Sequence, residues 1–508
     1  MRGQLGLGLP RGRDSAMTSL HTLLRQFDSS ISLSGIPNTE INGVREDSRQ
    51  VTPGDLFVAR GGTKTDGAKY VADAKDRGAV AVVCEEKIPN NPLPCVVVKN
   101  AGAAASVLAN LFHGSPSATM RAFAVTGTNG KTTTTYLIRH LLGKVNQRCG
   151  LIGTVEIDDG RSRREAEMTT PAACDIADLL ATMSNRGCRA VAMETSSHAL
   201  DQGRVAGVQF AGAAFTNLTG DHLDYHKTME NYAAAKAQLF ATLDAEAVAV
   251  VNADDKWSDR MIQDCPSRII RFGFGKRADY RARDVAVTAS GTHFILHTPD
   301  GRAEVSMPMI GKHNIENALA AAALVGEVCG LSVHQIAKGL SDCHGAPGRL
   351  QPVRAGQDFA VLVDYAHTDD ALENVLSALR PLCKNKGRLR VVFGCGGDRD
   401  RTKRPRMAKI AEKLADEIYI TSDNPRTENP QQILDEIVAG LSADTDKLVC
   451  VEVDRRTAIQ RVLSDAAAGD IVLIAGKGHE NYQILGKEKH HFDDVEEAMR
   501  VLGQKSAA

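Results

Sequence analysis

The stretch A-V-T-G-T-N-G-K-T-T-T-T, residues 124–135, predicts a phosphate-binding loop between a strand and a helix. Gly127 and Gly130 allow a tight turn whose backbone N–H groups can converge on a phosphate. Lys131 supplies a mobile positive charge for the β- and γ-phosphates, and Thr132 offers a hydroxyl to Mg²⁺. The stretch therefore indicates a nucleotide-binding α/β domain.

The loop departs from the usual pattern at one position. The pattern G-x-x-x-x-G-K-[ST] needs glycine at position 125, where this chain has Val125. A plain glycine turn before an ordinary helix is therefore the alternative interpretation. The context favours the phosphate loop, because an apolar run precedes it and a helix with one apolar face follows. That face consists of Leu137, Ile138, Leu141 and Leu142.

The amino-acid composition excludes several classes of protein and of binding partner. A chain of 508 residues, 43% hydrophobic and 24% charged, is typical of a globular protein of about three domains. The net charge of −1 shows no basic excess for nucleic acid or an anionic membrane. Eleven cysteines without a C-x-x-C pair favour a reduced, cytoplasmic setting over disulfides or a zinc site. We expect no membrane insertion, because no apolar run reaches the roughly 18 residues of a span.

Three α/β domains are predicted from the order of apolar runs. They are a small N-terminal domain (1–100), a central P-loop ATPase-like parallel-sheet domain (101–347) and a C-terminal Rossmann-like domain (348–508). We expect residues 1–16 to be a disordered extension too broken for a signal peptide, with Met17 as a possible start. Expected strands lie at 54–59, 79–84, 359–365, 390–396, 417–423 and 471–477, and expected helices at 70–77, 371–379 and 405–414.

Polar clusters follow nearly every predicted strand of the last two domains. Ligands of open α/β sheets bind beyond the carboxyl ends of the strands, so six such clusters predict a large site. Any single cluster is equally well explained as a helix cap or a loop. The clusters are E-T-S-S-H (194–198), T-N-L-T-G-D-H-L-D-Y-H (216–226), D-Y-A-H-T (364–368), G-C-G-G-D-R-D (394–400), T-S-D-N-P-R (421–426) and A-G-K-G-H-E (475–480).

Taken together, these motifs resemble the Mur ligases. The resemblance runs from about residue 40 to the end, and it also rests on G-x-H-N-x-x-N (311–317) and G-R-L-Q (348–351). It implies an ATP-dependent amide ligase of peptidoglycan synthesis that uses Mg²⁺ and an acyl-phosphate intermediate. Motif order and wording match the members that add the third amino acid of the peptide stem. The expected substrates are therefore ATP, UDP-MurNAc-L-Ala-D-Glu and meso-diaminopimelate. We expect the protein to be a monomer.

The chemistry of amide formation agrees with this resemblance. A carboxylate must be activated before an amine attacks it, and ATP does so by phosphorylation. Phosphoryl transfer needs positioning and cationic groups more than a protein nucleophile. Ser197 and His198 adjoin, but the chain has no G-x-S-x-G elbow.

The resemblance also implies roles in the ATP and metal sites. Lys131 and Thr132 are expected to hold phosphates and Mg²⁺, Glu194 to be a Mg²⁺ carboxylate, and His222 to bind at a second metal position. Asp221, Asp224 and His226 are expected to be mostly structural. For Asn314, Arg349 and Asp364, the alternative is a structural role as helix caps or in salt bridges. The expected ATP residues are Gly127, Thr128, Asn129, Gly130, Lys131, Thr132, Thr133, Asn314, Arg349 and Asp364.

Lys236 has two opposed interpretations. It lies in N-Y-A-A-A-K-A-Q-L-F, a predicted helix, where most lysines are solvated surface charges. In similar ligases the lysine at this place is carbamylated, which turns a cation into an anionic metal ligand. We therefore expect carbamylated Lys236 to act with Lys131 and His222 as the catalytic group, and with Thr132, Glu194 and His222 as a metal ligand.

Substrate contacts follow in the same way. Asp47-Ser48-Arg49 and Thr63-Lys64-Thr65 are expected to bind the UDP part, although the second triplet departs from the family's wording. The residues expected at UDP-MurNAc-dipeptide are Ser48, Thr169, Thr170, Ser196, Gln202 and Arg204. Those expected at diaminopimelate are Arg399, Asp423, Asn424, Arg426, Gly476 and Glu480.

Three other functions stay open from the sequence. A lysine-adding relative would share most motifs but lack the arginine of D-N-P-R at position 426. Folylpolyglutamate synthases share the phosphate loop and the two following domains, but their loop lies near the N-terminus. A P-loop switch protein without ligase activity would not need a third domain rich in carboxylate-binding groups.

Overall fold

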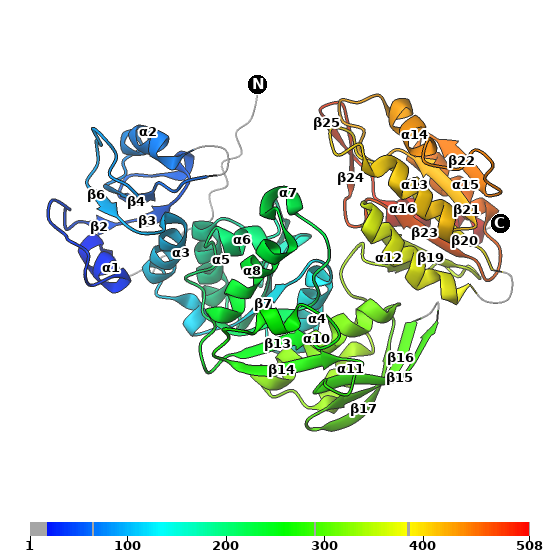
Figure 1. The fold of residues 1–508 in the computed structure, drawn as a ribbon, viewed down its shortest axis with the longest axis horizontal. Coiled ribbons are helices and arrows are strands. Elements are labelled where there is room, and N and C mark those ends of the chain that lie inside the picture. Colours follow the sequence, from blue (N-terminus) through cyan, green and yellow to red (C-terminus); the bar gives the residue numbers. More distant parts are fainter. Residues whose placement is uncertain (1–17, 63–65, 289–290, 384–386, 507–508) are drawn as a thin grey trace. The chain divides into compact units, whose positions relative to one another are not determined.

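The computed structural model describes residues 18–62, 66–288, 291–383 and 387–506 (Figure 1). The chain divides into two compact units, one of residues 1–281 with 319–332 and one of residues 282–318 with 333–508. The predicted limits of three domains stay a prediction. The predicted extension 1–16, Met17 and the triplet 63–65 lie outside the described residues.

The N-terminal part of the first unit is a four-stranded parallel sheet in the order β3-β4-β5-β6. Its residues alternate between two apolar clusters, one with α1 and α3 and the other with α2. The predicted strands and helix of this region are confirmed as β4, β5 and α2. The elements are β1 (Thr18–Ser19), α1 (Leu20–Phe27), β2 (Glu40–Ile41), β3 (Gly43–Arg45), β4 (Asp55–Val58), α2 (Val71–Asp76), β5 (Ala81–Cys84), β6 (Cys95–Val97) and α3 (Ala101–Phe112).

The central sheet of the first unit is parallel in the order β8-β11-β7-β12-β13-β14. Helices α5 and α8 pack their apolar residues on the sheet in one cluster. The predicted apolar face of α4 is also buried. The elements are β7 (Arg121–Thr126), α4 (Lys131–Lys144), β8 (Cys149–Ile152), β9 (Glu156–Asp158), β10 (Arg163–Glu165), α5 (Ala173–Asn185), β11 (Ala190–Glu194), α6 (Ser197–Asp201), β12 (Phe210–Phe215), α7 (Leu223–His226), α8 (Met229–Ala241), β13 (Val248–Asn252), α9 (Ser258–Met261) and β14 (Arg268–Gly273).

The expected alternation of strands and helices in the central region is wrong for residues 268–307. Four strands follow one another there without a helix: β14, β15 (Tyr280–Thr288), β16 (Gly291–Thr298) and β17 (Gly301–Met307). Strands β16 and β17 pair as an antiparallel hairpin from Thr298 to Gly301. Its turn has the sequence T-P-D-G, and Gly301 has a φ of +146°. That turn signal was readable in the sequence.

The second unit contains a six-stranded sheet in the order β18-β19-β23-β20-β21-β22, parallel except for β18. Helices α12, α13 and α14 cover one face, and α15 and α16 cover the other (Figure 1). This arrangement confirms the predicted buried parallel strands and helices. The sheet and its helices are β18 (Gln351–Val353), β19 (Ala360–Asp364), α12 (Asp369–Leu379), β20 (Leu389–Phe393), α13 (Lys403–Leu414), β21 (Glu417–Thr421), α14 (Pro430–Val438), β22 (Leu448–Glu452), α15 (Arg455–Asp465), β23 (Ile471–Ala475) and α16 (Asp494–Ser506).

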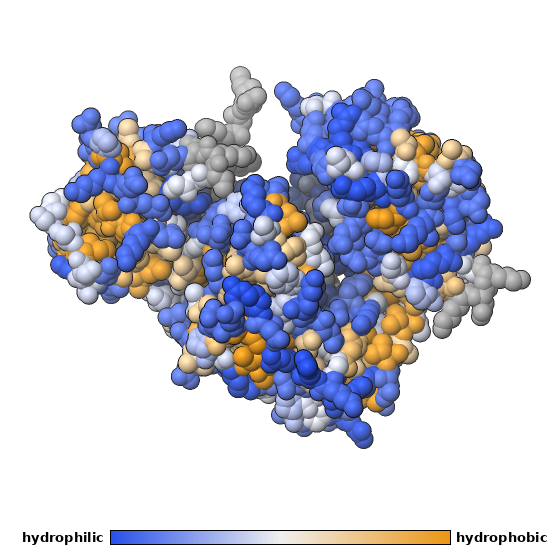
Figure 2. Space-filling model, in the orientation of Figure 1, coloured by the Kyte–Doolittle hydropathy of each residue, from blue (hydrophilic) through white to orange (hydrophobic). Residues whose placement is uncertain are grey.

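Four further elements, apart from short 3-10 helices, remain in the described chain. They are α10 (Lys312–Cys329), α11 (Val333–Leu340) and a hairpin of β24 (Tyr482–Leu485) and β25 (Glu488–His491). Hydrophilic residues cover most of the face seen in Figure 2, and apolar residues there form small separate patches. Across the described part of the chain, no helix combines the length and apolar character that crossing a membrane requires.

Candidate active site

The predicted phosphate loop lies at the carboxyl edge of the central sheet. Strand β7 ends at Thr126, and α4 begins five residues later at Lys131. Gly127 and Gly130 have φ values of +147° and +86°, which side chains rarely tolerate. Gly130 is the N-cap of α4 and makes no side-chain cap bond. The partial positive charge of this helix N-terminus therefore favours an anion.

The loop is held by the segment that follows β12. The Thr128 amide donates to the Asn217 carbonyl (2.8 Å), and the Asn129 amide donates to Asn217 Oδ1 (3.0 Å). The Thr216 hydroxyl donates to the Asn129 carbonyl (2.6 Å). These contacts fix the loop before any ligand binds, which reduces the entropy cost of binding.

Two lysine side chains converge on this loop. Lys131 Nζ donates to the carbonyls of Gly127 (2.9 Å) and Thr128 (2.8 Å). Lys236 on α8 donates to the same Gly127 carbonyl (2.9 Å) and lies over the Tyr232 ring, 4.7 Å from its centroid. Lys236 is only 1% exposed. Burial first, and the Lys131 charge second, lower the pKa of Lys236 well below its ordinary value. The surface-charge interpretation of Lys236 is therefore wrong, because the side chain is buried and its neutral amine is favoured.

Glu194 ends β11, the strand beside β7, and is also 1% exposed. Its carboxylate accepts hydrogen bonds from the Thr154 amide (2.8 Å) and the Thr154 hydroxyl (3.0 Å). These bonds orient the carboxylate at the edge of the sheet where the phosphate loop lies. A buried carboxylate with oriented oxygens is a suitable group for a hard cation.

Three histidines gather beside this edge. The His198 ring centroid lies 4.9 Å from that of His222 and 5.5 Å from that of His226. His226 is buried, and its Nε2 hydrogen-bonds to the Ser197 hydroxyl (2.9 Å). Burial is the largest cause that lowers the pKa of all three imidazoles. Near pH 7 the cluster is therefore largely neutral, as a metal ligand or hydrogen-bond acceptor requires.

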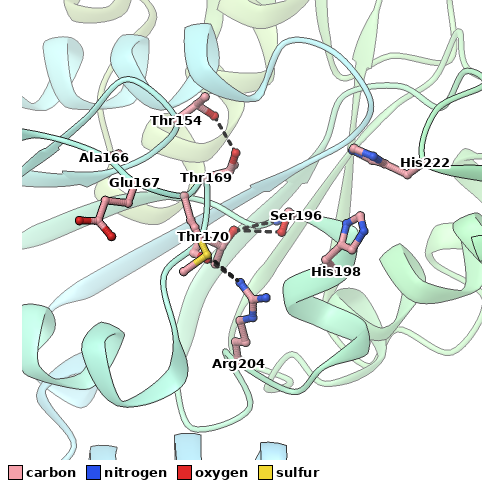
Figure 3. A pocket seen from close by; sticks show the side chains of 10 residues that line it. Thr154, Ala166, Glu167, Thr169, Thr170, Ser196, His198, Arg204 and His222 are labelled. Atoms are coloured by element: carbon pink, nitrogen blue, oxygen red, sulfur yellow. Dashed lines mark hydrogen bonds between the residues drawn. The ribbon is translucent and has the colours of Figure 1, made fainter. Parts of the chain in front are cut away.

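A pocket of about 370 Å³ opens next to these groups (Figure 3). The Thr170 hydroxyl donates to the Glu194 carbonyl (2.9 Å) and also contacts the Ser196 hydroxyl (3.3 Å). Arg204 donates to the Thr170 carbonyl (2.8 Å) and to Gln202 Oε1 (2.7 Å). The pocket is lined by Thr154, Ala166, Glu167, Met168, Thr169, Thr170, Ser196, His198, Arg204 and His222.

The structure thus brings most of the predicted dipeptide residues together. Thr169, Thr170, Ser196 and Arg204 line the pocket, and Gln202 contacts Arg204. Ser48 instead lies in the N-terminal part, buried in the short helix Ser48–Gln50, and does not line it. Neighbouring Asp47 and Arg49 form an ion pair (2.6 Å). A binding role for Ser48 stays a prediction.

The remaining predicted ATP residues belong to the second unit. Asn314 lies near the start of α10, where its side chain donates to the Ile310 carbonyl (2.8 Å). Asp364 ends β19 and accepts from the amides of Leu350 (2.7 Å) and Ala366 (2.8 Å). Burial raises the pKa of Asp364, and the charge of Arg349 opposes that shift. Their predicted contacts with nucleotide stay predictions.

The six predicted diaminopimelate residues follow the ends of β20, β21 and β23. Asn424 Nδ2 donates to Glu480 Oε2 (2.8 Å), and Arg426 Nη1 donates to the Gly397 carbonyl (2.9 Å). Gly476 has a φ of +114°, and a Cβ placed there would lie 4.0 Å from the Asp423 carboxyl carbon. The structure therefore brings Asp423, Asn424, Gly476 and Glu480 into one cluster. Arg426 borders it, and Arg399 is exposed on the loop that also contains Gly397.

Sequence reasoning missed several residues of these sites. Thr154, Asn217 and Tyr232 support Glu194, the phosphate loop and Lys236, and Lys477 contacts the cluster around Asn424. Lys477 stands inside the A-G-K-G-H-E cluster, which pointed to this region. For Thr154, the sequence contains no comparable signal, because its partner lies 40 residues away.

Sequence profiles of one family match three stretches of this chain. They are the Mur ligase family catalytic domain at residues 40–110, the Mur ligase middle domain at 125–325 and the Mur ligase glutamate ligase domain at 348–478. Together they cover more than half of the chain.

Whole-length relatives agree with these profiles. A UDP-N-acetylmuramoyl-L-alanyl-D-glutamate--2,6-diaminopimelate ligase from Thermosynechococcus vestitus is 46% identical over 473 residues, which is 92% of this chain and 94% of the relative. The enzyme of that name from Bacillus cereus is 43% identical over 92% of this chain and 94% of the relative. A solved structure with the same enzyme name is 34% identical, has a TM-score of 0.73 and is matched over 97% of this chain and 100% of that one.

Proposed function

The chain belongs to the Mur ligase family, and we propose that it joins meso-diaminopimelate to UDP-MurNAc-L-Ala-D-Glu at the expense of ATP. The observation that carries this proposal is the identity of 43–46% over more than nine-tenths of the chain to enzymes named for that reaction. The reaction is a step of peptidoglycan synthesis.

The proposed chemistry proceeds in two steps. A γ-carboxylate oxygen of D-glutamate attacks the γ-phosphorus of ATP, the bond to ADP breaks, and an acyl phosphate forms. The free amine of diaminopimelate then attacks the acyl carbon, loses a proton and expels inorganic phosphate. Lys131, whose ammonium contacts the loop, and the N-terminus of α4 would stabilise the charge on the transferring phosphoryl group.

The donor groups near the loop suit Mg²⁺. Glu194 and Thr132 offer hard oxygen ligands and His222 a largely neutral imidazole. Among the described residues, no group of three or more His, Cys, Asp or Glu side chains is spaced to hold a metal ion. A carbamate on Lys236 would add a further anionic oxygen. When bound, Mg²⁺ would neutralise phosphate charge.

Lys236 has the properties that carbamylation needs. The reaction joins the neutral amine to CO₂ and releases a proton, so a protonated ammonium cannot take part. Burial and the Lys131 charge favour the neutral amine of Lys236. Its contact with the Gly127 carbonyl places it against the phosphate loop.

The pocket around Thr170 and Arg204 is the proposed dipeptide site. Hydroxyls and a guanidinium suit the peptide carbonyls and the carboxylates of this substrate. In the second unit, Asp423 and Glu480 would hold the ammonium at the far end of diaminopimelate, and Arg426 its carboxylate. Lysine lacks that carboxylate.

Two alternatives are less well supported. A folylpolyglutamate synthase or a lysine-adding ligase would use the same ATP chemistry, but Arg426 and the similarity to diaminopimelate ligases favour the proposal made here. A non-ligase switch protein would not need the polar cluster of the second unit.

The function is tested by a screen of amino acids in the presence of ATP and UDP-MurNAc-dipeptide. The quantity measured is the release of inorganic phosphate. We expect release to require both the dipeptide and diaminopimelate. Release with neither would indicate a simple ATPase, and release with a folate substrate and glutamate would indicate the synthase.

The setting of the enzyme is also a proposal. All eleven cysteines are free, which agrees with a reduced compartment such as the cytoplasm. We propose a monomer that acts there on small molecules only.

A further inference from the structure

Lys477 is a lysine without exposed side-chain surface in the second unit. It directly follows Gly476, beyond the end of β23. Its ammonium donates to the Tyr482 carbonyl (2.6 Å) and to Asn424 Oδ1 (3.0 Å). Asp423 Oδ1 lies 3.3 Å away and Glu480 Oε2 3.8 Å away. A charged group this deeply buried needs such partners to offset its lost hydration.

The contacts of Lys477 orient the groups of the proposed amino-acid site. Asn424 Oδ1 accepts from Lys477 and from the Ile484 amide (3.0 Å), so the Asn424 Nδ2 group must face the other way. There it donates to Glu480 Oε2 (2.8 Å). Lys477 thus sets the direction of Asn424 and, through it, the position of the Glu480 carboxylate.

Lys477 also determines the charge of the cluster. Within the cluster, the carboxylates of Asp423 and Glu480 outnumber the Lys477 ammonium by one. Arg426 borders the cluster, and its guanidinium donates to the Gly397 carbonyl. The nearby Arg455 and Asp494 are both fully buried and neutralise each other at 2.6 Å. A cluster with one excess negative charge matches a ligand group with one positive charge.

The carboxylates respond to these neighbours in opposite ways. Burial alone would raise the pKa of Asp423, but the charges of Lys477 and Arg455 outweigh it and hold that pKa below its ordinary value. Burial first, and Asp423 second, raise the pKa of Glu480, and Lys477 opposes this shift. Lys477 therefore lowers the pKa of both carboxylates, and Glu480, whose pKa is already raised, is the one that the loss of Lys477 would shift further upward.

We propose that Lys477 is a positioning residue for the amino-acid substrate: it fixes Asn424 and Glu480 and sets the cluster to accept one ammonium group. The inference rests on the proposed function, because it assigns the substrate ammonium to this cluster. Lys477 itself does not contact the reacting atoms.

The test uses Lys477→Met, which keeps a long side chain and removes the charge. We expect the KM for diaminopimelate to rise by about 10–100-fold, in line with the loss of one or two hydrogen bonds to charged groups. The KM values for ATP and UDP-MurNAc-dipeptide should change less than about threefold. Lys487→Met, an exposed lysine between β24 and β25, is the matched control and should behave as wild type.

The pH profile separates a charge effect from a packing effect. Without Lys477, the pKa of Glu480 should rise further, so its carboxyl holds a proton at higher pH than in wild type. Protonated Glu480 cannot pair with an ammonium, so the variant's KM for diaminopimelate should fall as pH rises, over a range that lies higher than in wild type. The other charged or titratable groups near Glu480 are Asp423, Arg426, Arg455 and Tyr365. Lys477→Arg retains the charge and should retain the wild-type pH profile.

Two further measurements decide the interpretation. Calorimetry in buffers of different ionisation enthalpy should show proton release when diaminopimelate binds to Lys477→Met, and less release for wild type. If Lys477→Met does not fold, Lys477→Gln, which removes the charge but retains an N–H donor, replaces it. Wild-type KM and pH profile in these variants, or an equal rise in KM for all three substrates, would overturn the proposal. Wild type without diaminopimelate turnover would instead refute the proposed function, and the variants would then be compared on the amino acid that it uses.

Discussion

At the scale of single residues, Lys131 offers the most direct test of the phosphate loop. Its ammonium contacts two loop carbonyls from the first turn of α4. We predict that Lys131→Ala lowers the rate of phosphate release by at least about 10²–10³-fold, as loss of a preorganised charge-stabilising group does. Lys144→Ala, at the exposed end of the same helix, is the control and should retain activity. Near-normal turnover by a folded Lys131→Ala protein would contradict the assignment.

The proposed carbamylation of Lys236 supports a second prediction, because the added carboxyl group can be detected by its mass and replaced chemically. Lys236→Ala should be nearly inactive, and short carboxylic acids should restore part of the activity by supplying an anionic oxygen. Lys236→Arg cannot be carbamylated and should not be rescued by bicarbonate. Mass spectrometry under mild conditions should find an added carboxyl group on Lys236 in the wild type. An unmodified Lys236 in fully active enzyme would refute this role.

At the scale of elements, the turn between β7 and α4 needs glycine at position 127. A Cβ there would lie 2.0 Å from Thr216 Oγ1, and the φ of +147° disfavours a side chain. We predict that Gly127→Ala lowers the free energy of unfolding by at least about 1–3 kcal/mol and abolishes ATP-dependent turnover.

The control for this change lies in the helix that follows. A Cβ on Gly143 in α4 would meet no atom within 4 Å. Gly143→Ala should therefore leave activity unchanged and raise the free energy of unfolding by up to about 1 kcal/mol. Thermal denaturation of both variants compares the two positions. Equal stability of Gly127→Ala and wild type would show that the loop adapts to the side chain.

Local sequence patterns predicted the elements better than the contacts between them. Apolar runs located β19, β20, β21 and β23, because buried parallel strands need apolar residues on both faces. The grouping of His198 with His222 was not predictable, because it depends on how β11 and β12 flank β7. The burial of Lys477 was missed for the same reason, since a lysine after a strand usually faces water.

At the scale of the whole molecule, the substrate assignment depends on many positions together. No single motif identifies the family. Even the phosphate-loop motif is incomplete here, because Val125 stands where the full pattern has glycine. The similarity to named ligases extends over more than nine-tenths of the chain and includes both units. The first unit contains the phosphate loop and the proposed dipeptide pocket, and the second contains the proposed amino-acid cluster. An assay of ligase activity therefore tests the sites proposed in both units. The preference for one amino acid over another tests only the cluster proposed in the second unit.

The choice between diaminopimelate and lysine is the last prediction. The two amino acids differ by one carboxylate, and Arg426 presents a planar guanidinium fixed by its bond to the Gly397 carbonyl. Lysine would leave this guanidinium without a carboxylate partner, and sites built to bond a polar group reject an analogue that lacks this group by roughly 10⁴-fold. We expect that ratio of kcat/KM in wild type, and Arg426→Ala should lose most activity with diaminopimelate while the ratio narrows. Arg406→Ala, an exposed arginine on α13, is the control. Comparable kcat/KM values for lysine and diaminopimelate in wild type would overturn the assignment, because the Arg426 guanidinium would then gain nothing from the carboxylate that distinguishes them.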